Sequence, residues 1–485
     1  MGCSLHVRSR HRFLTLPLLT EFSSPGYCTG RSPVARVNRI PVLHGAPAKP
    51  RLACSLCVPK TGHPSAVGPP PGALPTSAET ARCAGGIALT HPARSATIAP
   101  ARQGRVAYPV PGYPSARSME RLPLFEAYPE LDLRLPRVPL ATLPTPVQPL
   151  ARLGQAMGIP GLYVKRDDLT SPLYGGNKVR KLEFLLAEAR RCGARTVITA
   201  GAVGSNHCLA TAIHGRRLEL RVVLVLVDQP VAQYVRTNLL LDHFHRARLC
   251  KTSLAAFPLR LAWHYLRGTD WRRLRPAFYI PFGGSSSLGC LGYVNAAFEL
   301  KKQVEEGLLP EPDYTFVAAG SLGTASGLVL GLRLAGLKTR VVGVRVTPVA
   351  LCSPSRWARM VNRTSASLTG RATTVPPVRV TPEELVLLGD FSGQGYARFT
   401  EEGMQAVHLM REHEGIRLEG TYTGKALAGT LDYIHKNQLE RQTHLFWNTY
   451  SSADLSSVAQ TIDYRDLPRA FHRYFEQPCQ ALDSD

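Results

Sequence analysis

The chain has 485 residues, enough for two or three domains with a large core, and a formal net charge of +23. About half of that charge lies in residues 1–118, which hold 14 basic residues and two carboxylates; the rest is spread without a basic stripe. This distribution argues against a nucleic-acid-binding protein. No run of 18 or more apolar residues occurs, so we expect no transmembrane helix and no membrane partner.

Residues 1–118 differ from the rest of the chain in composition. They are rich in Pro, Arg, Ser, Ala and Gly, contain no Asp, and show neither a helical nor a strand period. Such a segment cannot bury a core, so we expect it to be disordered. Arg8, Arg10 and Arg12 before an apolar run at residues 13–19 mimic a signal peptide, although that run is short and holds a proline, and the Arg-rich, acid-poor composition mimics an organelle transit peptide. We favour a third interpretation, a non-native extension before an initiator at Met119, because ordinary globular composition begins there.

The eleven cysteines form no recognisable framework. Five lie in residues 1–118 and the other six are scattered singly, which does not indicate a disulfide-stabilised protein. Cys54 and Cys57 make one isolated CxxC without a second pair at ligand spacing, so we expect no metal site. A reducing, cytoplasmic location is therefore expected.

From about residue 120 the pattern alternates between short apolar runs and amphipathic stretches. Strands are predicted at residues 163–165, 196–199, 220–227, 277–280, 314–319, 341–346 and 444–447. One helix is predicted from Lys178 to a stop at Gly193, and others at 206–213, 234–244, 291–306, 400–413 and 425–436, with one more before 341. This alternation predicts an α/β protein whose parallel sheets are covered by helices.

Lys178 follows a pair of glycines and lies in the first turn of a predicted amphipathic helix. The backbone N–H groups and the positive end of that helix disfavour an ammonium ion. A lysine with a lowered pKa is suited to forming an imine with an aldehyde. The alternative is a solvated lysine at a helix start, as most lysines are exposed.

Two further loops lie between a predicted strand and a helix, where open α/β sheets bind ligands. Ser205 and Asn206 place hydrogen-bonding side chains at a helix start, although either would also serve as an ordinary N-cap. The second loop can bring its backbone close to an anion, and its alternative is a plain tight turn. It lacks the lysine of a P-loop and the GxGxxG spacing, so a single phosphate monoester is the predicted ligand. This loop comprises Gly320, Ser321, Leu322, Gly323 and Thr324.

A fourth loop, Asn448–Ser452, follows the last predicted strand and offers the hydroxyl of Thr449 to a heterocyclic nitrogen, or forms a simple turn. An imine-forming lysine, a monophosphate cradle and a ring-binding hydroxyl together describe a site for pyridoxal 5′-phosphate, a cofactor that stabilises carbanions. The joint occurrence of these loops in one α/β chain supports that cofactor.

Residues 135–455 resemble the D-cysteine desulfhydrase/1-aminocyclopropane-1-carboxylate deaminase family of pyridoxal-phosphate-dependent enzymes of fold type II, the tryptophan synthase β-like fold. The resemblance covers about two thirds of the chain and rests on seven stretches in the family's order. These are residues 143–147, 164–169, 175–183, 205–207, 283–294, 320–324 and 422–426.

The resemblance implies roles for individual residues. Lys178 resembles the Schiff-base lysine, Asn206 the asparagine that binds the cofactor's phenolic oxygen, and the Gly320–Thr324 loop the phosphate cradle. Ser205 resembles the serine near the substrate carboxylate, and Tyr422 the active-site tyrosine. Thr449 resembles the threonine facing the pyridine nitrogen, where a neutral hydroxyl favours elimination over transamination.

This sequence departs from the family at the pocket. Thr423 stands where the cyclopropane deaminases carry glutamate, which makes that activity less expected. Asn448–Ser451 replaces His-Thr-Gly-Gly and adds bulk near the cofactor. Gly204 stands where many members have glutamine, and Glu419-Gly420-Thr421 replaces Asp-Pro-Val. These changes concern the substrate more than the cofactor.

The resemblance implies a larger cofactor-binding domain of residues 119–183 and 288–475, a smaller domain of residues 184–287, and a homodimer. The expected function is β-elimination on a small amino acid, as in D-cysteine desulfhydrase, giving pyruvate, ammonia and sulfide. The alternatives are cyclopropane ring opening and a protein that binds the cofactor without turnover.

Overall fold

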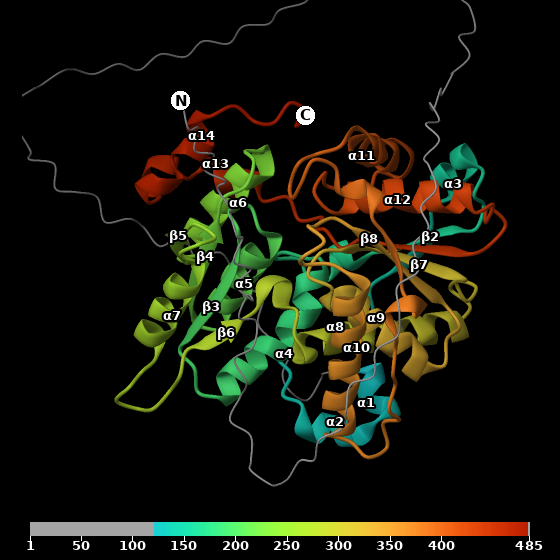
Figure 1. Ribbon diagram of the computed structural model, residues 1–485, viewed down its shortest axis with the longest axis horizontal. Coiled ribbons are helices and arrows are strands. Elements are labelled where there is room, and N and C mark those ends of the chain that lie inside the picture. Colours follow the sequence, from blue (N-terminus) through green and yellow to red (C-terminus); the bar gives the residue numbers. More distant parts are fainter. Residues whose placement is uncertain (1–120, 484–485) are drawn as a thin grey trace, which may run out of the picture. The chain divides into compact units, whose positions relative to one another are not determined.

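The computed structural model describes residues 121–483, so the predictions for residues 1–118 and for Met119 lie outside the described part (Figure 1). Two β-sheets form the framework of the described chain, and helices cover both faces of each.

The larger sheet has the strand order β1-β2-β10-β7-β8-β9. Its strands lie far apart in the sequence, and all neighbours run parallel except β1 and β2. The strands are β1 (Val147–Pro149), β2 (Leu162–Lys165), β7 (Tyr314–Ala319), β8 (Arg340–Arg345), β9 (Val386–Leu388) and β10 (His444–Trp447). The smaller sheet is parallel throughout, in the order β5-β4-β3-β6. It consists of β3 (Thr196–Ala202), β4 (Arg221–Val227), β5 (Arg248–Lys251) and β6 (Phe278–Ile280).

Alternate residues of the larger sheet face two separate cores. On one face, Val317 and Trp447 pack against α1 (Pro123–Ala127), α8 (Ser287–Glu305), α9 (Gly323–Ala335) and α10 (Pro354–Thr369). On the other face, Phe316 and Phe446 pack against α3 (Ala151–Met157), α11 (Glu401–Glu414) and α12 (Thr423–Lys436). Burial on both faces explains why the middles of these parallel strands are mostly apolar.

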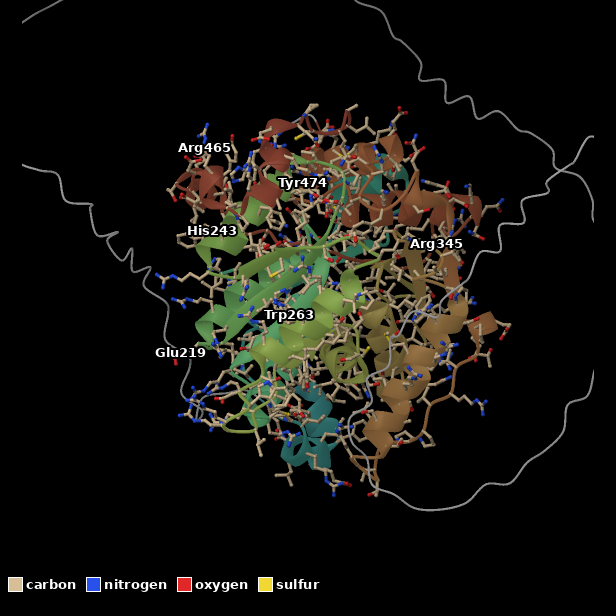
Figure 2. All side chains as sticks on the ribbon, turned by 60° about the vertical axis from the view of Figure 1, so that its left-hand side comes forward. Glu219, His243, Trp263, Arg345, Arg465 and Tyr474 are labelled. Carbon is tan, nitrogen blue, oxygen red and sulfur yellow. The ribbon has the colours of Figure 1, made fainter. Side chains whose placement is uncertain are left out.

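The smaller sheet is covered in the same way. Helices α4 (Asn177–Arg191), α5 (Asn206–Arg217) and α6 (Gln233–Phe244) cover one face, and α7 (Phe257–Gly268) covers the other. The outer side of α7 carries Trp263, whose exposed fraction is 52% (Figure 2). The remaining short helices are α2 (Pro129–Arg134), α13 (Ser456–Gln460) and α14 (Arg473–Glu476). Within residues 121–483, no helix has the length and apolar character needed to cross a bilayer.

The predicted α/β fold is confirmed, and each predicted strand and helix overlaps an observed one. The stop at Gly193 is also observed, because α4 ends at Arg191 and Gly193 has a φ of +69°. The elements that were not predicted are α1, α2, β1, α3, β5, α7, α10, β9, α13 and α14. In α10 the buried face places Thr364 and Ser365 among Trp357, Val361 and Leu368, and these two polar residues interrupt the apolar repeat in the sequence.

Candidate active site

The twin glycines before α4 allow two loops to pack against the start of that helix. A Cβ atom on Gly175 would lie 2.2 Å from the Asp168 carbonyl oxygen. Gly176 has a φ of +89°, and its Cβ would lie 2.8 Å from the Thr449 carbonyl oxygen. That same oxygen accepts a 3.1 Å hydrogen bond from the Asn177 backbone N–H. The Gly-Gly pair is therefore required by close backbone approach rather than by flexibility.

A buried ionic network anchors the start of α4 through Arg180. The Arg180 guanidinium donates to both carboxylate oxygens of Asp167 and of Glu299, at 2.8–3.1 Å. Lys165 adds a 2.6 Å bond to Glu299. Arg180, Asp167, Glu299 and Lys165 are all at most 2% exposed. Because each charge has partners of opposite sign, the network can hold α4 rigidly.

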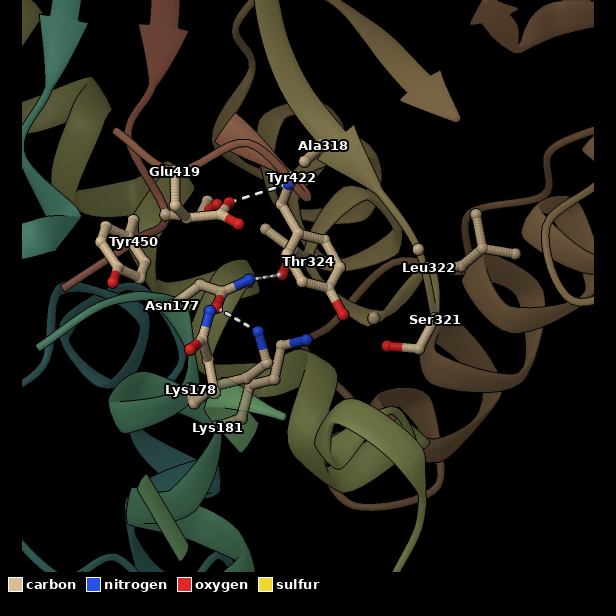
Figure 3. Close-up of a pocket in the computed structure, with 14 residues that line it drawn as sticks. Asn177, Lys178, Lys181, Ala318, Ser321, Leu322, Thr324, Glu419, Tyr422 and Tyr450 are labelled. Atoms are coloured by element: carbon tan, nitrogen blue, oxygen red, sulfur yellow. Dashed lines mark hydrogen bonds between the residues drawn. The ribbon is translucent and has the colours of Figure 1, made fainter. Parts of the chain in front are cut away.

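Lys178 is half-buried at the floor of a pocket, and its Nζ donates a 2.5 Å hydrogen bond to the Asn177 Oδ1 (Figure 3). Its pKa is lowered from 10.5 to about 7, mainly by burial and also by the nearby ammonium of Lys181, while Glu419 acts in the opposite direction. The lowered pKa was expected, but its main cause is burial rather than the helix terminus. Lys178 is thus a reactive amine near neutral pH.

The pocket brings together side chains from loops of both sheets, in about 460 Å³ of space that is partly open to solvent. Figure 3 shows the side chains of Lys178, Lys181, Tyr422 and Ser321 directed toward one region. The lining residues are Asn177, Lys178, Lys181, Asn206, Ala318, Gly320, Ser321, Leu322, Gly323, Thr324, Glu419, Tyr422, Thr449 and Tyr450. Every residue predicted for the site lies in this set except Ser205.

Ser205 is the N-cap of α5, because its Oγ accepts a 3.3 Å bond from the Cys208 backbone N–H. The ordinary capping alternative therefore describes the position of this side chain. Asn206, the next residue, does line the pocket. Its Oδ1 accepts hydrogen bonds from the Tyr174 hydroxyl at 3.1 Å and from Asn238 Nδ2 at 3.0 Å.

One end of the pocket is built for an anion. The Gly320–Thr324 loop joins β7 to α9, and Leu322 has a left-handed φ of +67° at the N-cap of that helix. A Cβ on Gly323 would lie 2.5 Å from the Ser285 Oγ and 3.1 Å from the Lys181 Nζ. Backbone N–H groups, hydroxyls and an ammonium thus converge at a helix N-terminus, the donor set that suits a phosphate.

Sequence reasoning missed Lys181 and Ser285 at this end. Lys181 lies one turn after Lys178 and was read as part of the helix, although the i, i+3 spacing already placed both on one face. Burial lowers the pKa of Lys181 to about 8. Ser285 lies in a Gly-Gly-Ser stretch that carried no assigned role, and its Oγ hydrogen bonds Ser321 Oγ at 2.7 Å.

Tyr422 stands above Lys178, whose Nζ lies 5.9 Å from the centre of its ring. The Tyr422 hydroxyl is 2.5 Å from the hydroxyl of Tyr396, a residue that the sequence did not single out. Burial raises the pKa of Tyr422 well above its usual value, and the neighbouring Tyr396 adds to this effect. Both phenols are therefore neutral at physiological pH and able to donate or accept a proton.

Glu419 is a buried carboxylate that caps the start of α12. It accepts 2.8 Å bonds from the backbone N–H groups of Thr421, Tyr422 and Thr423. The Thr423 hydroxyl also donates to it, at 3.2 Å. Burial raises the pKa of Glu419, and the three backbone donors act against that rise. The Thr423 side chain is consequently turned toward Glu419.

Thr449 and Tyr450 form another wall of the pocket. The Tyr450 ring lies against the guanidinium of Arg417, with 5.6 Å between the guanidinium carbon and the ring centre. Such a contact holds the ring in place by a cation–π interaction. The bulky side chain expected from the Asn448–Ser451 stretch is therefore Tyr450, which lines the pocket.

Gly204, which stands where many family members have glutamine, packs against the side-chain amide of another glutamine, Gln229. A Cβ there would lie 2.7 Å from Val235, 2.9 Å from Tyr234 and 3.1 Å from the Gln229 Nε2. Gln229 accepts from the Gly204 backbone N–H at 2.9 Å and donates to the Tyr234 hydroxyl at 2.7 Å. The side chains of Val235, Tyr234 and Gln229 thus fill the space that a residue other than glycine at 204 would need.

Known proteins resemble this chain across the described region. Residues 138–449 match the family described as "Pyridoxal-phosphate dependent enzyme". The D-cysteine desulfhydrase of Klebsiella pneumoniae subsp. pneumoniae is 37% identical over 316 residues, 63% of this chain and 91% of that protein. The Salmonella schwarzengrund D-cysteine desulfhydrase is 37% identical over 313 residues, 63% and 90% of the two chains. The crystal structure of an ACC deaminase homologue has 32% identity and a TM-score of 0.56, covering 71% of this chain and 99% of its own.

Proposed function

Since this chain belongs to the family of pyridoxal-phosphate-dependent enzymes that includes the D-cysteine desulfhydrases, we propose that it catalyses β-elimination on a small amino acid. The substrate that we favour is D-cysteine, which would react with water to give pyruvate, ammonia and sulfide. The relatives named D-cysteine desulfhydrase, matched over about nine tenths of their length, support this substrate. The observation that carries the proposal is the half-buried amine of Lys178 facing a phosphate-shaped cradle.

The pocket residues fit pyridoxal 5′-phosphate, which supplies an electron sink for the carbanion formed at the substrate Cα. Lys178 would hold the cofactor's aldehyde carbon. Lys181, Ser285 and the Gly320–Thr324 loop would hold its phosphate, since their donors converge around Gly323. Asn206 and Thr449 would contact the ring.

Two groups could move the proton of the substrate Cα. Lys178 would supply a neutral amine next to the bound substrate, because burial lowers its pKa to about 7. The Tyr422 hydroxyl, paired with that of Tyr396, is the second candidate. We assign Lys178 as the base because a neutral phenol with a raised pKa is a poor acceptor at pH 7.

Cyclopropane ring opening is the alternative within the family. Thr423 argues against it in this chain, because its short hydroxyl is committed to Glu419 and leaves no second carboxylate at that position. A protein that binds the cofactor without turnover is the alternative of another class. Assays for sulfide and keto acid across D- and L-amino acids, and with 1-aminocyclopropane-1-carboxylate, separate these three functions.

The decisive variant is Lys178→Ala. It should abolish the visible absorbance of the bound cofactor and lower turnover at least about 1,000-fold, because both binding and proton transfer use the same amine. Lys436, on the exposed end of α12, serves as the control: Lys436→Ala should keep both signals. An unchanged visible spectrum in Lys178→Ala would refute the assignment.

We also propose that the two sheets belong to two domains, residues 119–183 with 288–475 and residues 184–287, that the enzyme is a homodimer, and that it works in the cytoplasm. The larger sheet draws its strands from both sides of residues 184–287, which supports the division. Light scattering of the purified protein tests the dimer, and fractionation of cells that express it tests the location.

A further inference from the structure

The side-chain amide of Asn206 is held by residues on two other elements. Asn238, on α6, is 5% exposed and uses its Nδ2 for two hydrogen bonds. One goes to the Gly204 carbonyl oxygen at 2.9 Å and the other to the Asn206 Oδ1 at 3.0 Å. Tyr174, 6% exposed and just before the twin glycines, donates to the same Oδ1 at 3.1 Å.

These contacts determine the orientation of the Oδ1 and Nδ2 atoms in the side-chain amides of Asn238 and Asn206. The two ends of an asparagine amide are similar in size, so only the hydrogen-bond partners select the orientation. The Gly204 carbonyl can only accept, and therefore Asn238 must turn its Nδ2 toward it. The second hydrogen of that Nδ2 then points toward Asn206, whose Oδ1 accepts it. The chain of bonds thus starts at a backbone carbonyl that cannot be reversed.

The free end of Asn206 is decided by the same chain of bonds. With its Oδ1 saturated by two donors, its Nδ2 is the end left for the pocket that Asn206 lines. Among residues 121–483, no acceptor for that Nδ2 is found, so it is available to a bound molecule. A reversed amide would place Nδ2 against Nδ2 of Asn238 and would cost a buried hydrogen bond.

We infer that Asn238 is a positioning residue that sets the polarity of Asn206, so that the pocket presents a hydrogen-bond donor and selects an acceptor oxygen on the cofactor ring. This inference rests on the proposed function, in which that ring is pyridoxal phosphate. Tyr174 is a secondary support, because it strengthens the chosen orientation but a hydroxyl can also accept and does not by itself select it.

The test compares variants of the full-length protein by the absorbance of bound pyridoxal phosphate and by its dissociation constant. Asn238→Asp removes the donor, repels the Gly204 carbonyl and offers an acceptor to Asn206, which should reverse. An acceptor then faces the ring oxygen and favours its protonated form. We expect the visible band to move to shorter wavelength and the dissociation constant to rise about tenfold.

Two variants separate polarity from simple packing. Tyr174→Phe removes one donor but leaves Asn238 in place, so the band should keep its position and the dissociation constant should change less than about threefold. Asn295→Asp alters another buried asparagine, on α8, whose Oδ1 accepts from the Leu124 backbone N–H at 3.1 Å. It should leave the spectrum unchanged. Equal effects of the Asn238 and Tyr174 variants would overturn the inference.

If Asn238→Asp does not fold, Asn238→Leu tests the same relay. The leucine removes the group that selects the orientation and leaves Tyr174, whose hydroxyl can donate or accept, so the dissociation constant should rise and part of the band should move to shorter wavelength. The double variant Asn238→Leu with Tyr174→Phe should move the band at least as far, and an unmoved band in either variant contradicts the relay. Absence of a visible band in the wild-type protein would instead refute the proposed function, which keeps the two failures distinct.

Discussion

Replacing Glu299 with glutamine should destabilise this protein strongly, because the carboxylate lies between two buried cations. Its Oε1 accepts from Lys165 at 2.6 Å and from Arg180 at 2.9 Å, and its Oε2 accepts from Arg180 at 2.8 Å. Glutamine has nearly the same shape, so the substitution leaves packing intact. It removes the negative charge and turns an NH₂ group toward donors.

The magnitude follows from the burial of the network. Removing one partner of a buried ion pair costs about 3–5 kcal/mol, because the remaining charge has lost its compensation. Asp167 still faces Arg180 at 2.8 Å, which leaves Lys165 as the group without a carboxylate. The Thr145 carbonyl and the Gln303 amide still accept from Lys165, so we expect about 3 kcal/mol, the lower end of that range.

Guanidinium unfolding, followed by tryptophan fluorescence, measures this difference against a control on the same helix. Glu305 is exposed and lies 3.7 Å from Lys301, so Glu305→Gln should change the free energy of unfolding by less than about 0.5 kcal/mol. A Glu299→Gln variant that loses less than about 1 kcal/mol, or no more than the control, would refute the account of the network.

The same variant predicts a pH dependence. Burial by itself raises the pKa of Glu299, but Arg180 and Lys165 outweigh it and hold that pKa well below its usual value. A carboxyl group with a depressed pKa in the folded state stabilises the fold above its unfolded pKa of about 4.3. That contribution is lost as the pH falls toward the folded value. The difference between wild type and Glu299→Gln should therefore shrink below about pH 4.

Two further predictions concern the pocket. Thr423→Glu should not create efficient cyclopropane ring opening, which a ketobutyrate assay measures. It should also lower the melting temperature in calorimetry by several degrees, since a second buried carboxylate would face Glu419. Robust ring opening would contradict the ranking of this activity below β-elimination. The rate at which the apoenzyme takes up pyridoxal phosphate should rise with pH to a midpoint near 7, because only the neutral amine of Lys178 attacks the aldehyde. Lys181→Gln removes a nearby positive charge and should move that midpoint to higher pH; an unmoved midpoint in stopped-flow mixing would rule out this coupling.

The sequence by itself predicted the α/β fold, which the structure confirms, and Lys178 as the candidate cofactor-binding lysine, because both are local features. Strand and helix periods depend on neighbours within a few residues, and the Gly-Gly-Asn-Lys stretch carries its own turn and helix start. The rule that parallel strands present ligand sites at their carboxyl ends also brought Asn206, the Gly320–Thr324 loop and Thr449 into one prediction. The structure gathers these residues around a single pocket.

Only the tertiary structure decided how side chains from distant segments face one another. Lys181 turns toward the anion end, Ser205 caps a helix, and Gln229 packs on Gly204. The cause of the lowered pKa of Lys178 is also tertiary, because burial depends on everything that closes over it. Likewise the donor end of Asn206 is set by Asn238, 32 residues further along the chain. No local pattern encodes such orientations, since each is chosen by the partner that folding brings within hydrogen-bond distance.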